Sequence, residues 1–213
     1  MGEPAPLVVK IGGGLLRDDG LDGLRRACAD VSQAATTRPV LVVPGGGPFA
    51  DAVRAVDAQV GLTDAVAHAL ALRAMDQLGT LLAEMLPAAE LVSELAAPRT
   101  LGLLLAAPAF SGRPEVPESW KVTSDSLAVL AAAAIGGEQA VLLKPVAGLL
   151  PRWPSQAPPV AQLTAGELGA LQAAGGGQVV DAYLPEAVCR TGLNVIVRAP
   201  GAHGWSGTHI TPR

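Results

Sequence analysis

The first 60 residues repeat one unit twice, and this repeat limits the folds open to the chain. Each unit consists of a short apolar segment, three consecutive glycines and a segment with apolar residues at helical spacing. The apolar segments, LVVKI from Leu7 and VLVV from Val40, have the length of buried strands. Strands that alternate with helices are typical of a parallel sheet covered by helices. The sequence therefore predicts an α/β fold with both glycine runs at the carboxyl ends of strands.

The two glycine runs are candidate phosphate loops. Glycine allows positive φ and leaves no Cβ between the backbone and a ligand. Exposed backbone N–H groups beside the ammonium of Lys10 can hold a phosphate. A plain strand–turn junction with a solvated Lys10 is the alternative, so the rest of the chain must decide. The glycines concerned are Gly12, Gly13, Gly14, Gly45, Gly46 and Gly47.

The later chain continues the alternation of helices and strands. Thr63 can cap a long helix, and a Thr-Ser-Asp-Ser cluster from Thr123 opens another with more small polar residues than a cap requires. Residues 145–159 carry five prolines and predict a loop or lid. The expected helices are 21–35, 49–60, 63–85, 124–135, 164–174 and 185–191, and the further expected strands are 91–95, 101–106, 139–143, 194–197 and 207–210.

Composition excludes several classes of function. Half of the residues are hydrophobic and 16% are charged, which is typical of a globular protein. A net charge of −4 and 3% aromatic residues disfavour a nucleic-acid surface. No leader-like segment opens the chain and the apolar stretches are too short for a bilayer, so we expect a cytoplasmic protein without membrane contact. Cys28 and Cys189 lack metal-site spacing and are expected to be buried free thiols.

Two common nucleotide-binding motifs fit poorly. The sequence contains no GxxxxGK[ST] loop, which disfavours a P-loop enzyme. Residues 45–50 match GxGxxA between a strand and a helix, as in dinucleotide-binding domains. Such a domain requires a second strand ending in an acidic residue about 20 positions on, where this sequence predicts a helix.

Phosphoryl transfer explains the remaining features together. The reaction requires cations and hydrogen-bond donors around the transferred group, with acceptor and donor in line, and little covalent chemistry from the protein. Two glycine loops can hold the acceptor and the γ-phosphate. Lys10 can neutralise the developing charge, and Asp125 can orient that lysine. The sequence therefore predicts a kinase site without a P-loop lysine.

The segments VVKIGGGLL, VVPGGGPFADAV, VTSDSLA and GTHI together resemble the amino acid kinase superfamily over nearly the whole chain. This superfamily includes acetylglutamate, uridylate and isopentenyl phosphate kinases. The resemblance implies a single three-layer αβα sandwich with a mostly parallel sheet over residues 1–213. It also implies ATP and Mg²⁺ as cofactors and a homo-oligomer. Residues 1–120 would mainly hold the acceptor and residues 121–213 the nucleotide.

Within the superfamily, the sequence most resembles the kinase branch of methanofuran biosynthesis. The resemblance is carried by GGGPFAD, the helix after Thr63, Trp120 with VTSDS, and VDAYLPE. The resemblance implies phosphorylation of (5-(aminomethyl)furan-3-yl)methyl phosphate to the diphosphate. Isopentenyl phosphate kinases usually carry a histidine where this chain has Asp51. Asp51, with Asp64 and Asp76, would suit an acceptor that bears an amine. Isopentenyl phosphate, an amino acid, or a non-catalytic ligand-binding role remain alternatives.

The resemblance also implies residue roles. Lys10 neutralises phosphate, Asp125 organises the catalytic cation, and Val146 to Gly148 form the edge of the nucleotide pocket. The phosphate- and substrate-binding candidates besides the glycines are Asp51, Asp64, His68, Thr123 and Ser124. A surface pair of His68 with Asp64, four residues apart, is the alternative for those two. No metal-ligand set is predicted.

Two departures from the resemblance concern the second phosphate lysine. Relatives carry Thr-Asp where this chain has Lys144-Pro145, and a lysine after Gly-Gly-Met where this chain has Gly-Gly-Gln and no lysine. The chain has three lysines, Lys10, Lys121 and Lys144. Lys144 follows an expected strand, where ligands bind in such sheets. We therefore expect Lys144, rather than Lys121, to supply the second cation and to contact the nucleotide.

Overall fold

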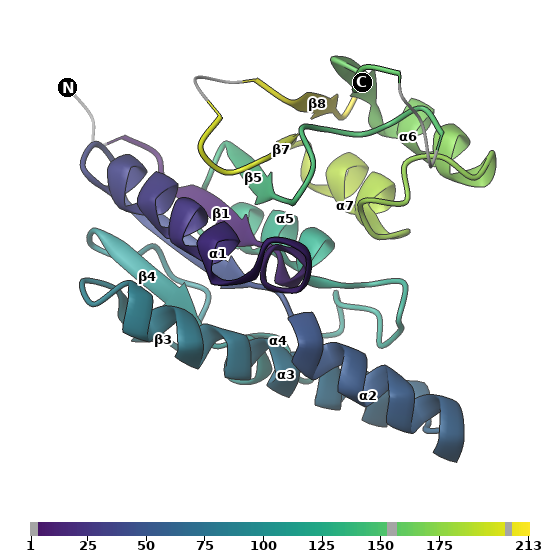
Figure 1. Ribbon diagram of the computed structural model, residues 1–213, viewed down its shortest axis with the longest axis horizontal. Helices are drawn as coiled ribbons and strands as arrows, with labels where there is room; N and C mark the ends of the chain where they lie inside the picture. The colour runs from purple at the N-terminus through teal and green to yellow at the C-terminus, as the bar shows by residue number, and fades with distance from the viewer. Residues whose placement is uncertain (1–3, 153–156, 203–205) are drawn as a thin grey trace.

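A central sheet with helices on both faces forms the protein, as the computed structural model of residues 4–152, 157–202 and 206–213 shows (Figure 1). The strand order is β3-β4-β2-β1-β5-β7-β8-β6, and every pair is parallel except β7 with β8. The predicted mostly parallel α/β fold is therefore confirmed. The strands are β1 (Leu7–Ile11), β2 (Val40–Pro44), β3 (Glu90–Val92), β4 (Leu101–Leu104), β5 (Gln139–Leu143), β6 (Gln162–Thr164), β7 (Asn194–Arg198) and β8 (Thr208–Thr211).

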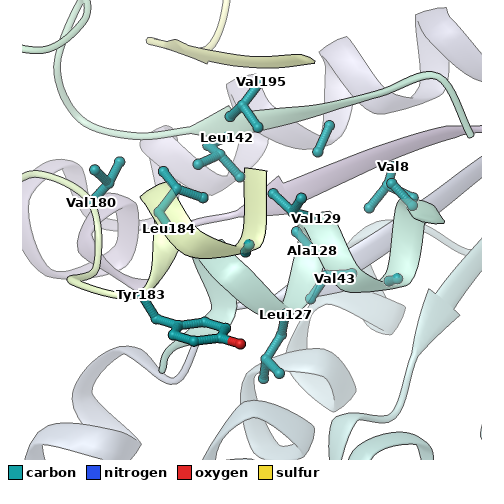
Figure 2. Packing of buried hydrophobic residues seen from close by; sticks show 14 of the residues in the cluster. Val8, Val43, Leu127, Ala128, Val129, Leu142, Val180, Tyr183, Leu184 and Val195 are labelled. Carbon is teal, nitrogen blue, oxygen red and sulfur yellow. The ribbon is translucent and has the colours of Figure 1, made fainter. Parts of the chain in front are cut away.

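Two hydrophobic cores lie on opposite faces of the sheet. Strand side chains alternate between the faces, so Val9 packs toward α1 and α3 while Val8 packs toward α5 and α7. Figure 2 shows the second core, where Val8 and Leu142 meet Val129 of α5. The helices are α1 (Gly13–Ala35), α2 (Gly47–Val60), α3 (Asp64–Met85), α4 (Ala106–Phe110), α5 (Ser124–Ala134), α6 (Ala165–Ala173) and α7 (Leu184–Thr191).

The same alternation places two lysines on one face. Lys10 is two residues after Val8 and therefore points toward α5. Strand β5 lies beside β1, with Leu142 opposite Lys10, and Lys144 follows two residues later on the same face. Both ammonium groups thus project from the carboxyl ends of neighbouring strands toward the start of α5.

Several element boundaries differ from those expected. Helix α1 begins at Gly13, inside the first glycine run, and is interrupted at Gly20 by a φ of 63° and a ψ of −153°. A carboxylate explains the early end of the strand expected over residues 101–106. Asp76 of α3 accepts hydrogen bonds from the N–H groups of Ala106 and Ala107, which start α4. The strand expected over 91–95 is β3, Glu90–Val92.

The two cysteines have different surroundings. Cys28 is buried, and its burial raises the pKa of the thiol to about 11. Cys189 of α7 is exposed, so the expectation that both are buried is wrong for Cys189. Helix α7 has only eight residues, and so short a segment does not reveal from its sequence whether Cys189 faces the core or the solvent. None of the helices in the described ranges is long and apolar enough to cross a membrane.

Candidate active site

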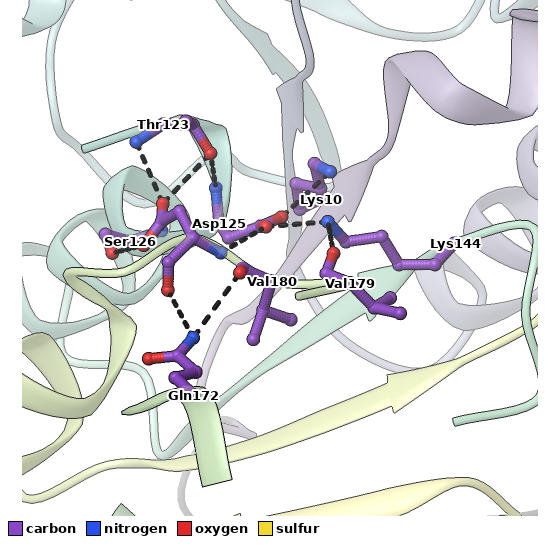
Figure 3. A network of polar contacts seen from close by, with 9 residues as sticks. Lys10, Thr123, Asp125, Ser126, Lys144, Gln172, Val179 and Val180 are labelled. Carbon is purple, nitrogen blue, oxygen red and sulfur yellow. Dashed lines mark hydrogen bonds and ion pairs between the residues drawn. The ribbon is translucent and has the colours of Figure 1, made fainter. Parts of the chain in front are cut away.

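A buried carboxylate joins the two lysines. Asp125 Oδ1 lies 2.9 Å from the Nζ atom of Lys10, and Asp125 Oδ2 accepts a hydrogen bond of 2.6 Å from Lys144 Nζ (Figure 3). Lys10 and Asp125 are 4% and 2% exposed. Lys144 also donates to the carbonyl oxygen of Val179, at 2.7 Å. The three candidate catalytic residues, which are up to 134 positions apart in the sequence, thus form one charged group.

This group carries a net positive charge at neutral pH. Burial lowers the pKa of Lys10 to about 8, against the opposing effect of Asp125. Burial alone would raise the pKa of Asp125, but Lys10 and Lys144 lower it to about 2. Asp125 is therefore ionised throughout the physiological range and does not serve as a proton acceptor. Its role is to hold two ammonium groups beside each other, where a phosphate chain can bind.

Asp181 holds this group in place, and the sequence analysis gave it no role. Its Oδ2 atom accepts hydrogen bonds from the N–H groups of Thr123 and Ser126 and from the Thr123 hydroxyl, at 2.8 to 3.0 Å. The Ser126 hydroxyl donates to Oδ1. The Asp181 N–H in turn donates to Asp125 Oδ2 at 3.2 Å. Burial and the nearby Asp125 raise the pKa of Asp181.

Asp181 therefore caps α5 from a segment more than 50 residues away. A local signal existed, because the polar Thr-Ser-Asp-Ser cluster exceeds what its own cap needs. That signal does not reveal which distant carboxylate will meet it. Gln172 supports the arrangement by donating to the carbonyl oxygen of Asp181 at 3.0 Å.

The two glycine loops touch each other, which gives a structural reason for several glycines. A Cβ atom built on Gly13 would lie 2.1 Å from the backbone nitrogen of Gly47, whose φ is +53°. A Cβ on Gly45 would lie 2.6 Å from the nitrogen of Gly13, and one on Gly12 would lie 2.7 Å from the carbonyl oxygen of Leu143. Gly14 differs, because its nearest neighbours would be 3.5 Å away. A Cβ atom at Gly14 would therefore make ordinary van der Waals contacts, so packing does not require glycine at this position.

A first cleft lies between the glycine loops, α2, α3 and the start of α5, and we call it the α2–α3 cleft. Buried His68 forms part of its wall. Burial lowers the pKa of His68, while Glu118 opposes this shift, so the imidazole is neutral at pH 7. Its lining residues are Gly13, Gly14, Arg17, Gly46, Gly47, Ala50, Asp51, Arg54, His68, Ala71, Leu72, Met75, Ser119, Trp120, Val122, Thr123, Ser124 and Leu127.

Charged residues that the sequence analysis missed line this cleft. Arg54 donates to Asp51 Oδ1 at 3.1 Å, and Arg17 Nη1 lies 3.7 Å from Asp51 Oδ2. The Arg54 guanidinium stacks 4.7 Å from the ring centre of Trp120. Trp120 Nε1 donates to Asp57 at 2.7 Å, which fastens the loop before α5 to α2. Their helical positions gave no signal, since an arginine three residues after an aspartate is usually an ordinary surface pair.

A second cleft, which we call the β5 cleft, meets the first at the glycine loop. Gly14 and Arg17 line both clefts. The β5 cleft has a volume of about 330 Å³ and contains both lysines of the charged group. It is lined by Lys10, Gly14, Arg17, Asp18, Lys144, Pro145, Val146, Gln178 and Val179.

Some of the predicted site residues lie elsewhere. Asp64 is exposed and lines neither cleft, whereas His68 is buried in the wall of the α2–α3 cleft, so the alternative of a surface pair between them is not realised. Asp76 is engaged with α4. Gly148 packs against Thr208, where an added Cβ would lie 2.6 Å from the hydroxyl oxygen. Lys121 is exposed and lines neither cleft.

The chain belongs to the amino acid kinase family, because the model of that family matches residues 5–198. It is 26% identical over 152 residues to (5-(aminomethyl)furan-3-yl)methyl phosphate kinase from Methanocaldococcus jannaschii, which covers 69% of each chain. The chain is therefore a phosphotransferase of the kinase type, as the sequence predicts.

Solved structures of the same family share the fold. Uridylate kinase from Archaeoglobus fulgidus superposes with a TM-score of 0.73 at 18% identity, over 96% of this chain and 99% of that chain. UMP kinase from Bacillus anthracis superposes with a TM-score of 0.72 at 16% identity, over 99% and 97%. These similarities confirm the predicted amino acid kinase fold.

Proposed function

We propose that the chain transfers the γ-phosphate of ATP to a phosphate monoester and forms a diphosphate. The carrying observation is the Lys10–Asp125–Lys144 group, whose lysines line the β5 cleft, and this cleft meets the α2–α3 cleft at Gly14 and Arg17. The β5 cleft would hold the nucleotide phosphates, and the α2–α3 cleft would hold the acceptor. In this proposal residues 1–120 would mainly supply the acceptor side and residues 121–213 would mainly supply the nucleotide side, as the family resemblance implies.

In this proposal an acceptor phosphate oxygen attacks the γ-phosphorus, the bond from that phosphorus to the bridging oxygen breaks, and ADP leaves. Lys10 and Lys144 stabilise the charge on the transferring group and the leaving oxygen. Asp125 keeps the two ammonium groups in register. Because a phosphate monoester is already anionic at neutral pH, the site needs no general base, which agrees with an ionised Asp125 bound to lysines.

The described residues fit a Mg²⁺ ion that enters with the nucleotide. Among residues 4–152, 157–202 and 206–213, no group of three His, Cys, Asp or Glu side chains could form a metal cage. Mg²⁺ commonly binds through substrate phosphates and one or two carboxylates. Asp18 is a carboxylate on the wall of the β5 cleft that could hold such an ion, whereas Asp125 is paired with both lysines. When bound, Mg²⁺ would neutralise charge on the ATP phosphates.

We further propose (5-(aminomethyl)furan-3-yl)methyl phosphate as the acceptor. The relative from Methanocaldococcus jannaschii carries this name and supports the proposal. The α2–α3 cleft offers a flat wall at Trp120 and apolar side chains such as Leu72 and Met75 for a ring, with arginines for a phosphate. The homo-oligomer implied by the family resemblance and the cytoplasmic location expected from the sequence remain predictions.

An acceptor panel tests this function. Purified protein with MgATP would be assayed by ³¹P NMR on the furanmethyl phosphate, its unphosphorylated alcohol, isopentenyl phosphate, UMP and aspartate. We expect ADP and a diphosphate with the furanmethyl phosphate, and no product with the alcohol. An ATP analogue that binds by calorimetry without turnover on any acceptor would instead favour a non-catalytic ligand-binding protein.

A further inference from the structure

The guanidinium groups of Arg17 and Arg54 face one carboxylate in the α2–α3 cleft. Asp51 Oδ1 accepts a hydrogen bond of 3.1 Å from Arg54, and Asp51 Oδ2 lies 3.7 Å from Arg17. The arginines come from different helices, the first segment of α1 and the middle of α2. The loops that start these helices touch at Gly13 and Gly47. Two cations therefore meet beside both glycine loops, and a single anionic group lies between them.

This arrangement matches what a phosphate requires. Guanidinium groups bind phosphate oxygens through two parallel N–H donors, and charge-assisted bonds of this kind are the stronger ones. A carboxylate between two arginines presents anionic acceptor oxygens to both guanidinium groups, as a phosphate would, but with less negative charge. Asp51 is about half exposed, with 43% of its side chain accessible, so it can leave the pair without burying an unpaired charge.

We propose that Arg17 and Arg54 clamp the phosphate of the acceptor, and that Asp51 is a resident counterion which this phosphate displaces. The inference rests on the proposed function, because it takes the acceptor to be a phosphate monoester. It reverses the role that the sequence suggested for Asp51, which was attraction of an amine. Asp51 instead competes with the substrate and sets how tightly an acceptor phosphate binds.

The two arginines have different positions and therefore different expected kinetic effects. Arg54 lines the α2–α3 cleft, whereas Arg17 lines both clefts and also donates to Asp18 Oδ1 at 2.9 Å on the nucleotide side. In this proposal Arg54 contacts the acceptor phosphate but not the nucleotide, so it contributes to acceptor binding. Arg17 reaches the boundary that the transferred group crosses, so it also stabilises the transition state.

Three substitutions test the clamp by KM and kcat for the acceptor. Asp51→Asn removes the competing charge and should lower the acceptor KM by roughly three- to tenfold. Arg54→Met should raise KM about tenfold with kcat nearly unchanged, as expected for loss of one charge-assisted bond. Arg17→Met should raise KM and also lower kcat by roughly tenfold or more.

Asp22 and Arg25 provide a matched control. They form an aspartate–arginine pair at the same three-residue spacing, 2.7 Å apart, on the exposed side of α1. Asp22→Asn and Arg25→Met should leave KM and kcat unchanged. Thermal melts of all variants would show whether each is folded. Arg54→Lys keeps the positive charge, and we expect its acceptor KM to lie between those of the wild type and Arg54→Met.

Binding of inorganic phosphate separates this inference from the proposed acceptor. Calorimetry would be run with the nucleotide cleft saturated by a non-hydrolysable ATP analogue and Mg²⁺. If phosphate binds more tightly to Asp51→Asn and more weakly to both arginine variants, the clamp is supported even when the furanmethyl phosphate is not turned over. The clamp would be overturned if phosphate bound more weakly to Asp51→Asn than to the wild type. It would also be overturned if the arginine variants bound phosphate as tightly as the Asp22 and Arg25 controls.

Discussion

The two clefts are built in different ways. Side chains of α2, α3 and the loop before α5 form much of the wall of the α2–α3 cleft. Arg54 pairs with Asp51 and stacks on Trp120, which donates to Asp57 of α2. The β5 cleft is bounded by the loop after β5 and by the segment at Gln178 and Val179. A hydrogen bond from Lys144 to the Val179 carbonyl joins these two segments. Side-chain chemistry thus shapes the first cleft, whereas loop backbone shapes much of the second.

This difference suggests where selectivity lies. Side chains fixed to helices can discriminate between acceptors by charge and shape, while a loop-walled cleft mainly offers cations and backbone groups to a polyphosphate. The two clefts share Gly14 and Arg17, so the transferred phosphate would pass at that boundary. Substitutions in the group formed by Lys10, Asp125 and Lys144 should have larger effects than substitutions of residues that line the α2–α3 cleft alone, because this group would stabilise charge on the transferred phosphate.

The largest effect is expected for Lys10→Met. Loss of the buried ammonium should lower kcat/KM at least roughly a thousandfold, since a single preorganised charge at a transition state is worth about that factor. The circular dichroism spectrum should remain that of the wild type. Lys121→Met is the matched control on an exposed lysine and should retain full activity. A well-folded Lys10→Met protein with wild-type turnover would contradict the site assignment.

A smaller effect is expected for Lys144→Met, which alters the wall of the β5 cleft. We predict a loss of about a hundredfold in kcat/KM, together with a higher KM for ATP, because Lys144 also holds the segment at Val179. The KM for the acceptor should change little. Steady-state kinetics with each substrate varied in turn would measure this. If the acceptor KM rose more than the ATP KM, Lys144 would instead act on the acceptor in the α2–α3 cleft.

Asp181 and Asp76 each accept hydrogen bonds from the first N–H groups of a helix that is distant in the sequence, α5 and α4 respectively. Asp181→Ala should cost about 3 kcal/mol of unfolding free energy, because it leaves buried donors unpaired, and should also lower kcat by releasing Asp125. Asp76→Ala should cost about 1–2 kcal/mol through loss of the α4 cap and should leave kcat unchanged. Urea unfolding and kinetics would measure both. Equal effects on kcat would show that Asp181 has no specific part in positioning Asp125.

The pH profile should report Lys10. Because its pKa is about 8 in the folded protein, the ammonium form is lost above this pH, and kcat/KM should fall about tenfold per pH unit there. Unfolding cannot explain such a fall. The unfolded chain, with a pKa of 10.5 for this lysine, binds the extra proton, so between about pH 8 and 10.5 this group makes the fold more stable as pH rises. A profile that stays flat to pH 10 would contradict the assignment.

Periodicity in the sequence predicted the sheet well. Apolar runs bounded by glycine or proline gave β1, β2, β5 and β7 to within a residue or so. The Thr63 cap marks a true helix start, and the helix expected over 164–174 begins with a capping box of Thr164 and Glu167. Strand alternation also accounts for Lys10 and Lys144 meeting on one face. These features are local, so the sequence carries them directly.

Other contacts between distant segments, unlike the pairing of Asp125 with Lys10, could not be predicted. The roles of Asp181 and Asp76 depend on which helix end each carboxylate meets in space, and neither has a local pattern. Likewise, Gly13 and Gly47 are required by the contact between their two loops as well as by any ligand. A phosphate loop and a loop–loop contact demand the same residue, so the sequence alone could not separate the two reasons.

Trp120 can serve as an intrinsic fluorescent probe of the α2–α3 cleft. Its indole lines the α2–α3 cleft, stacks on Arg54 and donates to Asp57, so any ligand that moves Arg54 changes the surroundings of the ring. It is the one tryptophan of the described residues, since Trp153 and Trp205 lie outside them. Tryptophan emission, compared with that of a Trp120→Phe variant, would then follow occupation of this cleft without a label or turnover, and stopped-flow mixing would give the rate at which an acceptor enters.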